Sequence, residues 1–251
     1  MTAGTLAGAG YFMGERLYPP RPSNPKGFYE DVEVNAVNEA ILTPVTPWAP
    51  RRFRPGRLYR LLRRTIFSSG FADGGRWLAQ VPVNKLLASS PEIETRIQAL
   101  VEQAPYCFKD PRFCYTLPIW RPWLQNTRFV CVFRDPTISA KSMLQESHTM
   151  PKLAGLKLTY ADCLAVWRLM YTHVLDIHSQ QGEWLFLHYD QVLDGSGLER
   201  LAEFLGAAPD RAFPDPTLRR TRPGESMPDD VQAVYQSLCR WAYGIEQENL
   251  L

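Results

Sequence analysis

The segment FVCVFRDPTISAKSM, residues Phe129–Met143, carries the strongest fold signal in the chain. Its first five residues are continuously apolar, as in a strand that is buried on both faces of a parallel sheet. Asp135 and Pro136 then lead directly into a helix that runs through Ser142, because proline is tolerated in the first helical turn. The strand therefore ends beside the guanidinium of Arg134 and the first N–H groups of a helix. This arrangement predicts an anion-binding site, although a local salt bridge and an ordinary helix serine explain the same pattern.

The rest of the chain alternates between strand and helix signals. A second buried strand is predicted at Trp184–Tyr189 and a weaker third at Tyr106–Asp110. Helical spacing of apolar residues predicts helices at 30–42, 90–103, 159–178, 197–205 and 229–245, with Ser90 as an N-cap. Strands that alternate with helices of this length predict an α/β fold, in which helices flank both faces of a mostly parallel sheet in three layers.

Composition excludes several classes of protein. The 251 residues suit one globular domain, and 45% hydrophobic with 22% charged residues is too apolar for a disordered tail. A net charge of +2 gives no general case for nucleic acid. No apolar run reaches the length of about 18 residues that a membrane span needs. The first ten residues are small and uncharged without a basic region, so we expect no secretory signal there. Five scattered cysteines without zinc or redox spacing indicate reduced thiols in a cytoplasmic protein.

Arginine is distributed unevenly along the chain. Seven of the 22 arginines fall within Arg51–Arg64, and no acidic residue occurs from Ala40 to Ala72. Two interpretations stay open for this segment. It is either a solvated amphipathic helix over the site, or a surface that contacts an anionic acceptor, a carrier protein or an acidic membrane. A second basic group consists of Arg219, Arg220 and Arg222.

Arg134 followed eight residues later by Ser142, after an apolar strand, resembles the 3′-phosphate-binding motif of sulfotransferases that use 3′-phosphoadenosine 5′-phosphosulfate (PAPS). Other segments resemble parts of this family, including its bacterial members, in the same order. These segments are NPKGFYED (Asn24–Asp31), YCFKDPRF (Tyr106–Phe113), FLHYDQVL (Phe186–Leu193) and DPTLRRTRPG (Asp215–Gly224). The resemblance extends over most of the chain and implies a P-loop-like nucleotide-binding fold.

The resemblance also implies a function and a set of site residues. The protein would transfer a sulfuryl group from PAPS to a hydroxyl or amine of a small-molecule, glycan or lipid acceptor, without a metal. Lys109 would contact the sulfuryl group, and Glu30 would be the base. Arg134 and Ser142 would hold the 3′-phosphate, and Tyr189 would lie near the adenine. A closing loop over the 3′-phosphate would contribute Arg219, Arg220 and Arg222.

Each of these residues also has a structural interpretation. Glu30, and with it Asp31, could simply stabilise the N-terminus of the helix that follows. Lys109 could form a structural pair with Asp110, which is itself a weaker candidate for the base. Tyr189 could be a core residue. The histidines are expected to be ordinary core or surface residues: His148, His173, His178 and His188.

One part of the family pattern is not found in this sequence. The family begins with a strand and a glycine-containing loop around the 5′-phosphosulfate, whereas MTAGTLAGAGYFMG resembles the helix that comes next. We therefore expect residues 1–251 to form a single sulfotransferase-like domain that lacks this strand and loop, and to transfer sulfate poorly. The alternative is a non-catalytic remnant or binding protein that retains only the 3′-phosphate site. A nucleotide kinase is disfavoured because the phosphate loop and a magnesium-binding aspartate are both missing.

Overall fold

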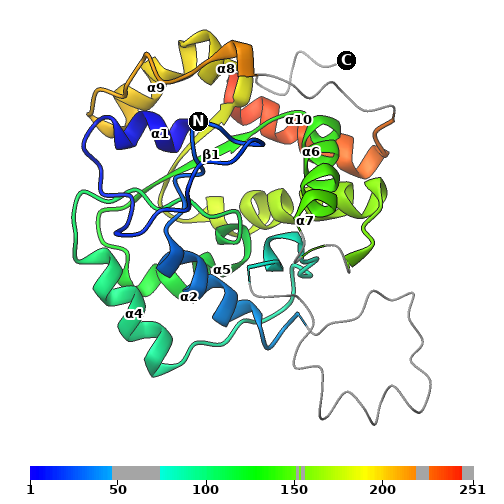
Figure 1. Cartoon of the computed structure of the whole chain (residues 1–251), viewed down its shortest axis with the longest axis horizontal. Helices are drawn as coiled ribbons and strands as arrows, with labels where there is room; N and C mark the ends of the chain where they lie inside the picture. The colour runs from blue at the N-terminus through cyan, green and yellow to red at the C-terminus, as the bar shows by residue number, and fades with distance from the viewer. Residues whose placement is uncertain (47–73, 151–152, 154–155, 219–225, 245–251) are drawn as a thin grey trace.

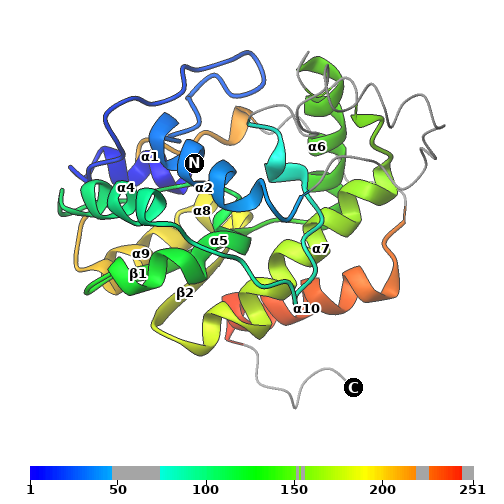
Figure 2. The same cartoon turned by 90° about the horizontal axis from the view of Figure 1, so that it is seen from below.

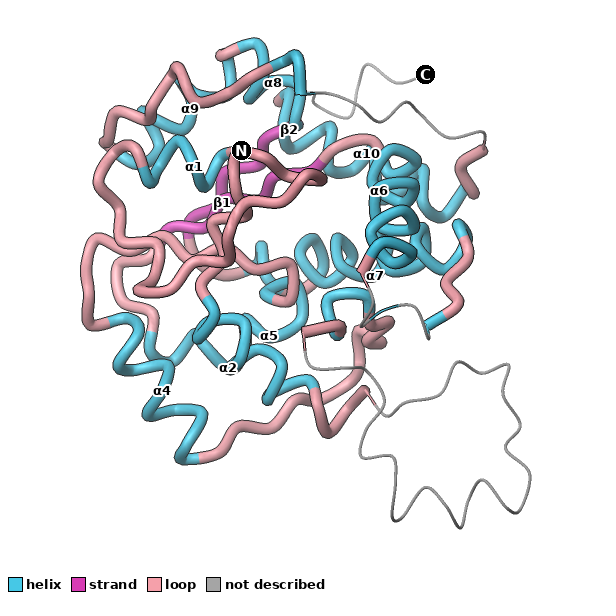
Figure 3. Tube along the Cα trace, viewed as in Figure 1, coloured by secondary structure: helices cyan, strands magenta, loops and turns pink. Residues whose placement is uncertain are grey.

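The computed structural model describes residues 1–46, 74–150, 153, 156–218 and 226–244 (Figure 1). Two parallel strands lie in the interior of this part of the chain (Figure 3). They are β1 (Arg128–Phe133) and β2 (Glu183–His188), and they pair residue by residue from Arg128 opposite Glu183 to Phe133 opposite His188. Both strands were predicted from their continuous apolar runs, and both predictions are confirmed.

Helices cover both faces of this small sheet (Figures 1 and 2). One face, with Cys131 and Phe186, packs against α6 (Pro136–Thr149), α7 (Tyr160–Asp176) and α10 (Asp229–Tyr243). The other face, with Leu185 and Leu187, packs against α1 (Thr2–Ala7), α8 (Tyr189–Asp194) and α9 (Ser196–Leu205). The described part of the chain therefore has the α/β character that the sequence predicted.

A third group of helices packs around Trp120, beside Phe129 of β1. These helices are α2 (Val32–Leu42), α4 (Pro91–Val101) and α5 (Phe113–Trp120). Ser90 is the N-cap of α4 as predicted, because its side-chain oxygen accepts the N–H of Ile93 at 3.3 Å. Short 3₁₀ helices are η1 (Arg76–Leu78), η2 (Arg121–Trp123), η4 (His178–Gln180) and η5 (Pro216–Leu218).

The third predicted strand, Tyr106–Asp110, is wrong. Its backbone forms a single parallel bridge with Phe12: Cys107 N–H donates to the Phe12 carbonyl, and Phe12 N–H donates to the Pro105 carbonyl, each at 2.8 Å. The ladder does not continue, and the chain turns at Asp110, whose carboxylate accepts the N–H of Arg112 at 2.9 Å. The apolar residues of this segment are half-buried, through packing and not through pairing in a sheet.

Two predicted features lie outside the described residues. They are the basic segment Arg51–Arg64 and the group Arg219, Arg220 and Arg222. Within the described ranges, no helix is both long enough and apolar enough to cross a membrane.

Two buried histidines lie between α7 and the elements packed against it. His173 donates through Nε2 to the carbonyl of Val81, and His178 donates through Nε2 to the carbonyl of Cys114, each at 2.9 Å. Their ring centroids are 6.2 Å apart. Both are core residues, which agrees with the structural interpretation of these histidines.

We expect His178 to make the protein less stable in acid. Burial is the main cause that lowers its pKa from 6.5 to about 4. Above pH 6.5 neither state binds a proton here, whereas between pH 6.5 and 4 only the unfolded state does. The free energy of unfolding should therefore fall by about 3 kcal/mol over this window. Urea unfolding of wild type and His178→Gln at several pH values measures this fall in the free energy of unfolding.

The glutamine keeps a donor for the Cys114 carbonyl but does not titrate, so the loss between pH 6.5 and 4 should shrink in this variant. His148→Gln is the matched control, because His148 is exposed on α6. An unchanged pH slope in His178→Gln would mean that His178 is not a source of acid sensitivity.

Candidate functional site

The two residues predicted for catalysis form an ion pair, although 79 positions separate them in the sequence. Lys109 Nζ donates a hydrogen bond to Glu30 Oε1. The side chain of Lys109 is 43% exposed and that of Glu30 is 14% exposed, so solvent or a substrate can reach the lysine. The structure therefore brings a cation and a carboxylate together at the surface of the domain.

The local sequence separates the role of Glu30 from that of Asp31. Asp31 is the N-cap of α2: its Oδ1 accepts the N–H of Glu33 at 2.8 Å and of Val34 at 3.1 Å. Its Oδ2 accepts the N–H of Arg16 at 2.9 Å. The helix-stabilising interpretation therefore applies to Asp31, and it leaves the carboxylate of Glu30 for Lys109.

The backbone around Glu30 is held in an unusual conformation. Tyr29 has φ +53°, a left-handed conformation that is uncommon for a residue with a bulky side chain. Its ring packs edge-on against Phe213 with centroids 5.4 Å apart. The N–H of Tyr18 donates to the carbonyl of Glu30 at 2.9 Å. Gly14 has φ +116°, and a Cβ there would lie 2.3 Å from the Asp31 Cβ, so this close approach requires glycine.

Lys109 does not form the structural pair with Asp110 that was its alternative. The Asp110 side chain is 0% exposed, and both its oxygens are taken by Asn35, Asn38 and Arg112. Burial raises the pKa of Asp110, and the positive charge of Arg112 opposes this effect. A carboxylate enclosed in this way cannot reach an acceptor's proton, so the structure does not favour Asp110 as the base.

Lys26 and Lys109 both act electrostatically on the amino group of Met1. Burial, and after it the positive charges of Lys109 and Lys26, lower the pKa of the Met1 amino group to about 5. Lys26 Nζ donates to the carbonyl of Phe213 and lies 4.0 Å from Asp215 Oδ2. Sequence reasoning did not single out Lys26, although it belongs to the segment NPKGFYED that was compared with the family.

Two of the other predicted site residues, Arg134 and Tyr189, lie where β1 and β2 end. Phe133, the last residue of β1, pairs with His188, the last residue of β2. The next residues, Arg134 and Tyr189, therefore follow the ends of two neighbouring strands. The Arg134 guanidinium carbon lies 6.0 Å from the centroid of the Tyr189 ring, within the range of a cation–π contact. Arg134 Nε also donates to Ser139 Oγ at 3.2 Å. Ser139 was not predicted, although its position one turn before Ser142 on α6 was visible in the sequence.

The sequence predicted that the first N–H groups of α6 would bind an anion, and the structure differs on this point. The carboxylate of Asp135 caps α6, accepting the N–H of Thr137 at 2.8 Å and of Ile138 at 3.1 Å. The N–H of Ser139 donates to the Asp135 carbonyl at 3.0 Å. These N–H groups are therefore not free for an anion, because an aspartate directly before Pro136 is itself a good N-cap. A phosphate here would depend on side chains such as Arg134 and Ser142.

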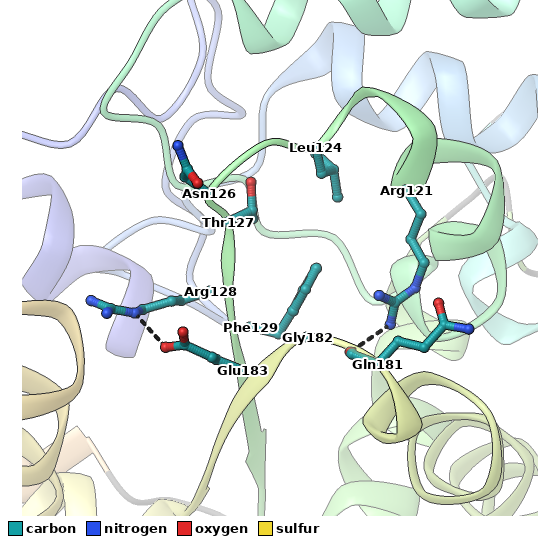
Figure 4. A pocket seen from close by; sticks show the side chains of 9 residues that line it. All are labelled: Arg121, Leu124, Asn126, Thr127, Arg128, Phe129, Gln181, Gly182 and Glu183. Atoms are coloured by element: carbon teal, nitrogen blue, oxygen red, sulfur yellow. Dashed lines mark hydrogen bonds and ion pairs between the residues drawn. The ribbon is translucent and has the colours of Figure 1, made fainter.

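A pocket of about 440 Å³ lies at the opposite ends of the strands (Figure 4). It is lined by Arg121, Leu124, Asn126, Thr127, Arg128, Phe129, Gln181, Gly182 and Glu183. Arg128 Nε pairs with Glu183 Oε2 at 2.8 Å, and Arg121 donates to the Gln181 carbonyl at 3.2 Å. Parallel sheets bind ligands at the carboxyl ends of their strands, whereas this pocket lies at the amino ends. It is separate from the site of Arg134 and Tyr189.

Comparison with known proteins gives one structural similarity. No protein-family model matches the chain, and no curated protein matches it. The chain is similar to a sulfotransferase domain. That solved structure is described as the sulfotransferase domain from the curacin biosynthetic pathway; it is 15% identical, with a TM-score of 0.43. The similarity covers 84% of this chain and 95% of that chain. A similarity of this degree identifies no activity, which has to be argued from the side chains.

Proposed function

We propose that the protein transfers a sulfuryl group from PAPS to a hydroxyl or amine of an acceptor. The observation that supports this most directly is the contact between Lys109 and Glu30. Transfer of a sulfuryl group, like that of a phosphoryl group, depends on positioning, on charge neutralisation and on removal of the acceptor's proton. An ammonium and a carboxylate in contact at the surface can provide the last two.

In this proposal Glu30 accepts the proton of the acceptor as its oxygen or nitrogen bonds to sulfur. The bond from sulfur to the 5′-phosphate oxygen breaks, and its electron pair stays with 3′-phosphoadenosine 5′-phosphate (PAP). Lys109 neutralises negative charge on the oxygens around the transferred group. A general base of this kind contributes about 10²–10⁴-fold to the rate.

The nucleotide is proposed to bind at the carboxyl ends of β1 and β2. Arg134 and Ser142 would hold its 3′-phosphate, Tyr189 would contact the adenine, and Arg219, Arg220 and Arg222 would close over the phosphate. The contact of the Arg134 guanidinium with the Tyr189 ring supports this assignment, because it presents a cation and an aromatic surface side by side. PAPS supplies the activated sulfuryl group.

The direct test is to incubate the protein with PAPS and a set of acceptors: a phenol, a sugar and an amine. We expect PAP release that depends on an acceptor, with the sulfated product detected by mass spectrometry. Tight binding of PAP without transfer to any acceptor would favour the binding protein that the sequence left as the alternative.

Arg134→Ala should weaken PAP binding by about 1.5–3 kcal/mol, because it removes a charge-assisted contact to the 3′-phosphate. Binding of adenosine 5′-monophosphate, which lacks that phosphate, should change little, and the wild type should prefer PAP. Calorimetry with both nucleotides measures these affinities. Arg128→Ala is the matched control, since Arg128 lies at the other end of β1 and pairs with Glu183. Equal affinity of the wild type for both nucleotides would refute the assignment of the 3′-phosphate site.

A further inference from the structure

A fully enclosed carboxylate lies directly beside the lysine of the candidate site. Asp110 Oδ2 accepts the side-chain amides of Asn35 at 2.9 Å and Asn38 at 3.0 Å. Asp110 Oδ1 accepts the N–H and the Nη1 of Arg112, each at 2.9 Å. Each oxygen therefore has two donors, which is the full complement of a buried carboxylate. The residue that follows Lys109 is fixed in place.

The two asparagines are fixed as well. Asn38 Oδ1 accepts the hydroxyl of Thr116 at 2.7 Å and the indole N–H of Trp120 at 2.9 Å. Asn35 Oδ1 accepts Arg112 Nη1 at 3.2 Å. These contacts orient both amides so that their N–H groups point at Asp110. Asparagine is unfavourable inside a helix, so its presence at two buried positions of α2 requires a reason in the tertiary structure.

The network extends further along the same face of α2 through a second acidic residue. Glu39 Oε1 accepts Arg112 Nε at 2.6 Å, and Glu39 Oε2 accepts Arg76 Nη1 at 2.6 Å. Arg112 also donates to the Gly74 carbonyl at 3.0 Å. The side chains of Arg76 and Arg112 are each 2% exposed. The two arginines balance Asp110 and Glu39, so the buried group is neutral and firmly connected.

We propose that Asp110, Asn35 and Asn38 are positioning residues that hold Lys109 against Glu30. Glu30 directly precedes the N-cap of α2, and the same helix presents both asparagines to Asp110. The network therefore joins the helix that begins just after Glu30 to the segment that carries the lysine.

The ion pair needs this support. An exposed lysine–carboxylate pair by itself contributes little to the free energy of folding. A flexible lysine side chain does not keep one geometry unless its backbone is fixed. The role of the network in turnover rests on the proposed sulfuryl transfer, whereas its role in forming the pair does not.

The test measures how fast an amine-reactive acetylating reagent modifies Lys109, read by peptide mass spectrometry. Exposed Lys85 serves as an internal reference. Pairing with Glu30 slows this reaction, so Glu30→Gln defines the rate of a released lysine. Asn38→Asp keeps the size of the side chain but places a carboxylate against Asp110. We expect several-fold faster acetylation of Lys109 in Asn38→Asp, close to the rate in Glu30→Gln, with Lys85 unchanged.

Two further variants make the result decisive. Val37→Ala is the control, because Val37 is fully buried on the same helix but belongs to the apolar cluster around Trp120. It should lower the melting temperature without changing the acetylation of Lys109. Asn35→Ala is the milder alternative if Asn38→Asp does not fold. Folded Asn38→Asp or Asn35→Ala with a wild-type rate of Lys109 acetylation would overturn the proposal.

If the proposed function is wrong, the experiments give a different combination of results. The wild type would then transfer no sulfate, while the acetylation result would still hold. If transfer is observed, the positioning variants should lower kcat and leave the affinity for PAP unchanged, because their side chains do not contact the nucleotide in this proposal.

Discussion

Replacing Glu30 by glutamine should lower sulfate transfer by about 10²–10⁴-fold, because the variant keeps the shape of the side chain but cannot accept the acceptor's proton. Binding of PAP should survive, since the nucleotide contacts proposed here lie at the ends of β1 and β2. The measurement is turnover at saturating PAPS, together with calorimetric titration of PAP. It requires an acceptor for which the wild type shows transfer.

Glu33→Gln is the matched control for this prediction. Glu33 lies three residues further along the chain, in the first turn of α2, but it pairs with Arg96 through a 2.6 Å contact and its side chain is 46% exposed. Neutralising it removes one carboxylate from the same region without touching Lys109, so turnover should stay within about twofold of the wild type. Near-normal turnover in Glu30→Gln would reassign the base and leave the ion pair with Lys109 as a structural contact.

The largest effect on stability is expected from Arg112→Met. Methionine replaces the apolar stem of the arginine but leaves the buried carboxylates of Asp110 and Glu39 without their shared guanidinium. Removing one partner from a buried ion pair costs about 3–5 kcal/mol, because an uncompensated charge remains in the interior. Urea unfolding at pH 7, followed by tryptophan fluorescence, measures the difference in the free energy of unfolding.

Arg211→Met provides the comparison for this variant. Arg211 also pairs with a glutamate, Glu199, but the two side chains are 63% and 70% exposed. An exposed pair contributes about 0–1 kcal/mol, so the same substitution should change stability very little there. Equal effects of the two substitutions would show that the group around Arg112 is not the buried charge network described above.

The sequence by itself was sufficient to predict the two central strands and several of the helices. Continuous apolar runs predicted β1 and β2, and helical spacing predicted α4 and α7, with Ser90 as the N-cap of α4. These signals are local: they depend on the alternation of side chains and on caps within one or two turns, so they can be recognised without knowing the rest of the fold. The cap of Asp135 on α6 was equally local, and its consequence for the helix N–H groups could have been deduced.

The tertiary structure alone decided which of the predicted residues meet. Nothing in the local pattern of Tyr106–Asp110 shows that the Asp110 carboxylate is enclosed, because the donors that enclose it include two asparagines more than 70 positions away. The pairing of Lys109 with Glu30, in place of Asp110, follows from the same packing of α2 against this segment. Such contacts depend on how helices and strands pack in three dimensions, and a buried polar group takes whichever partner that packing brings within hydrogen-bonding distance.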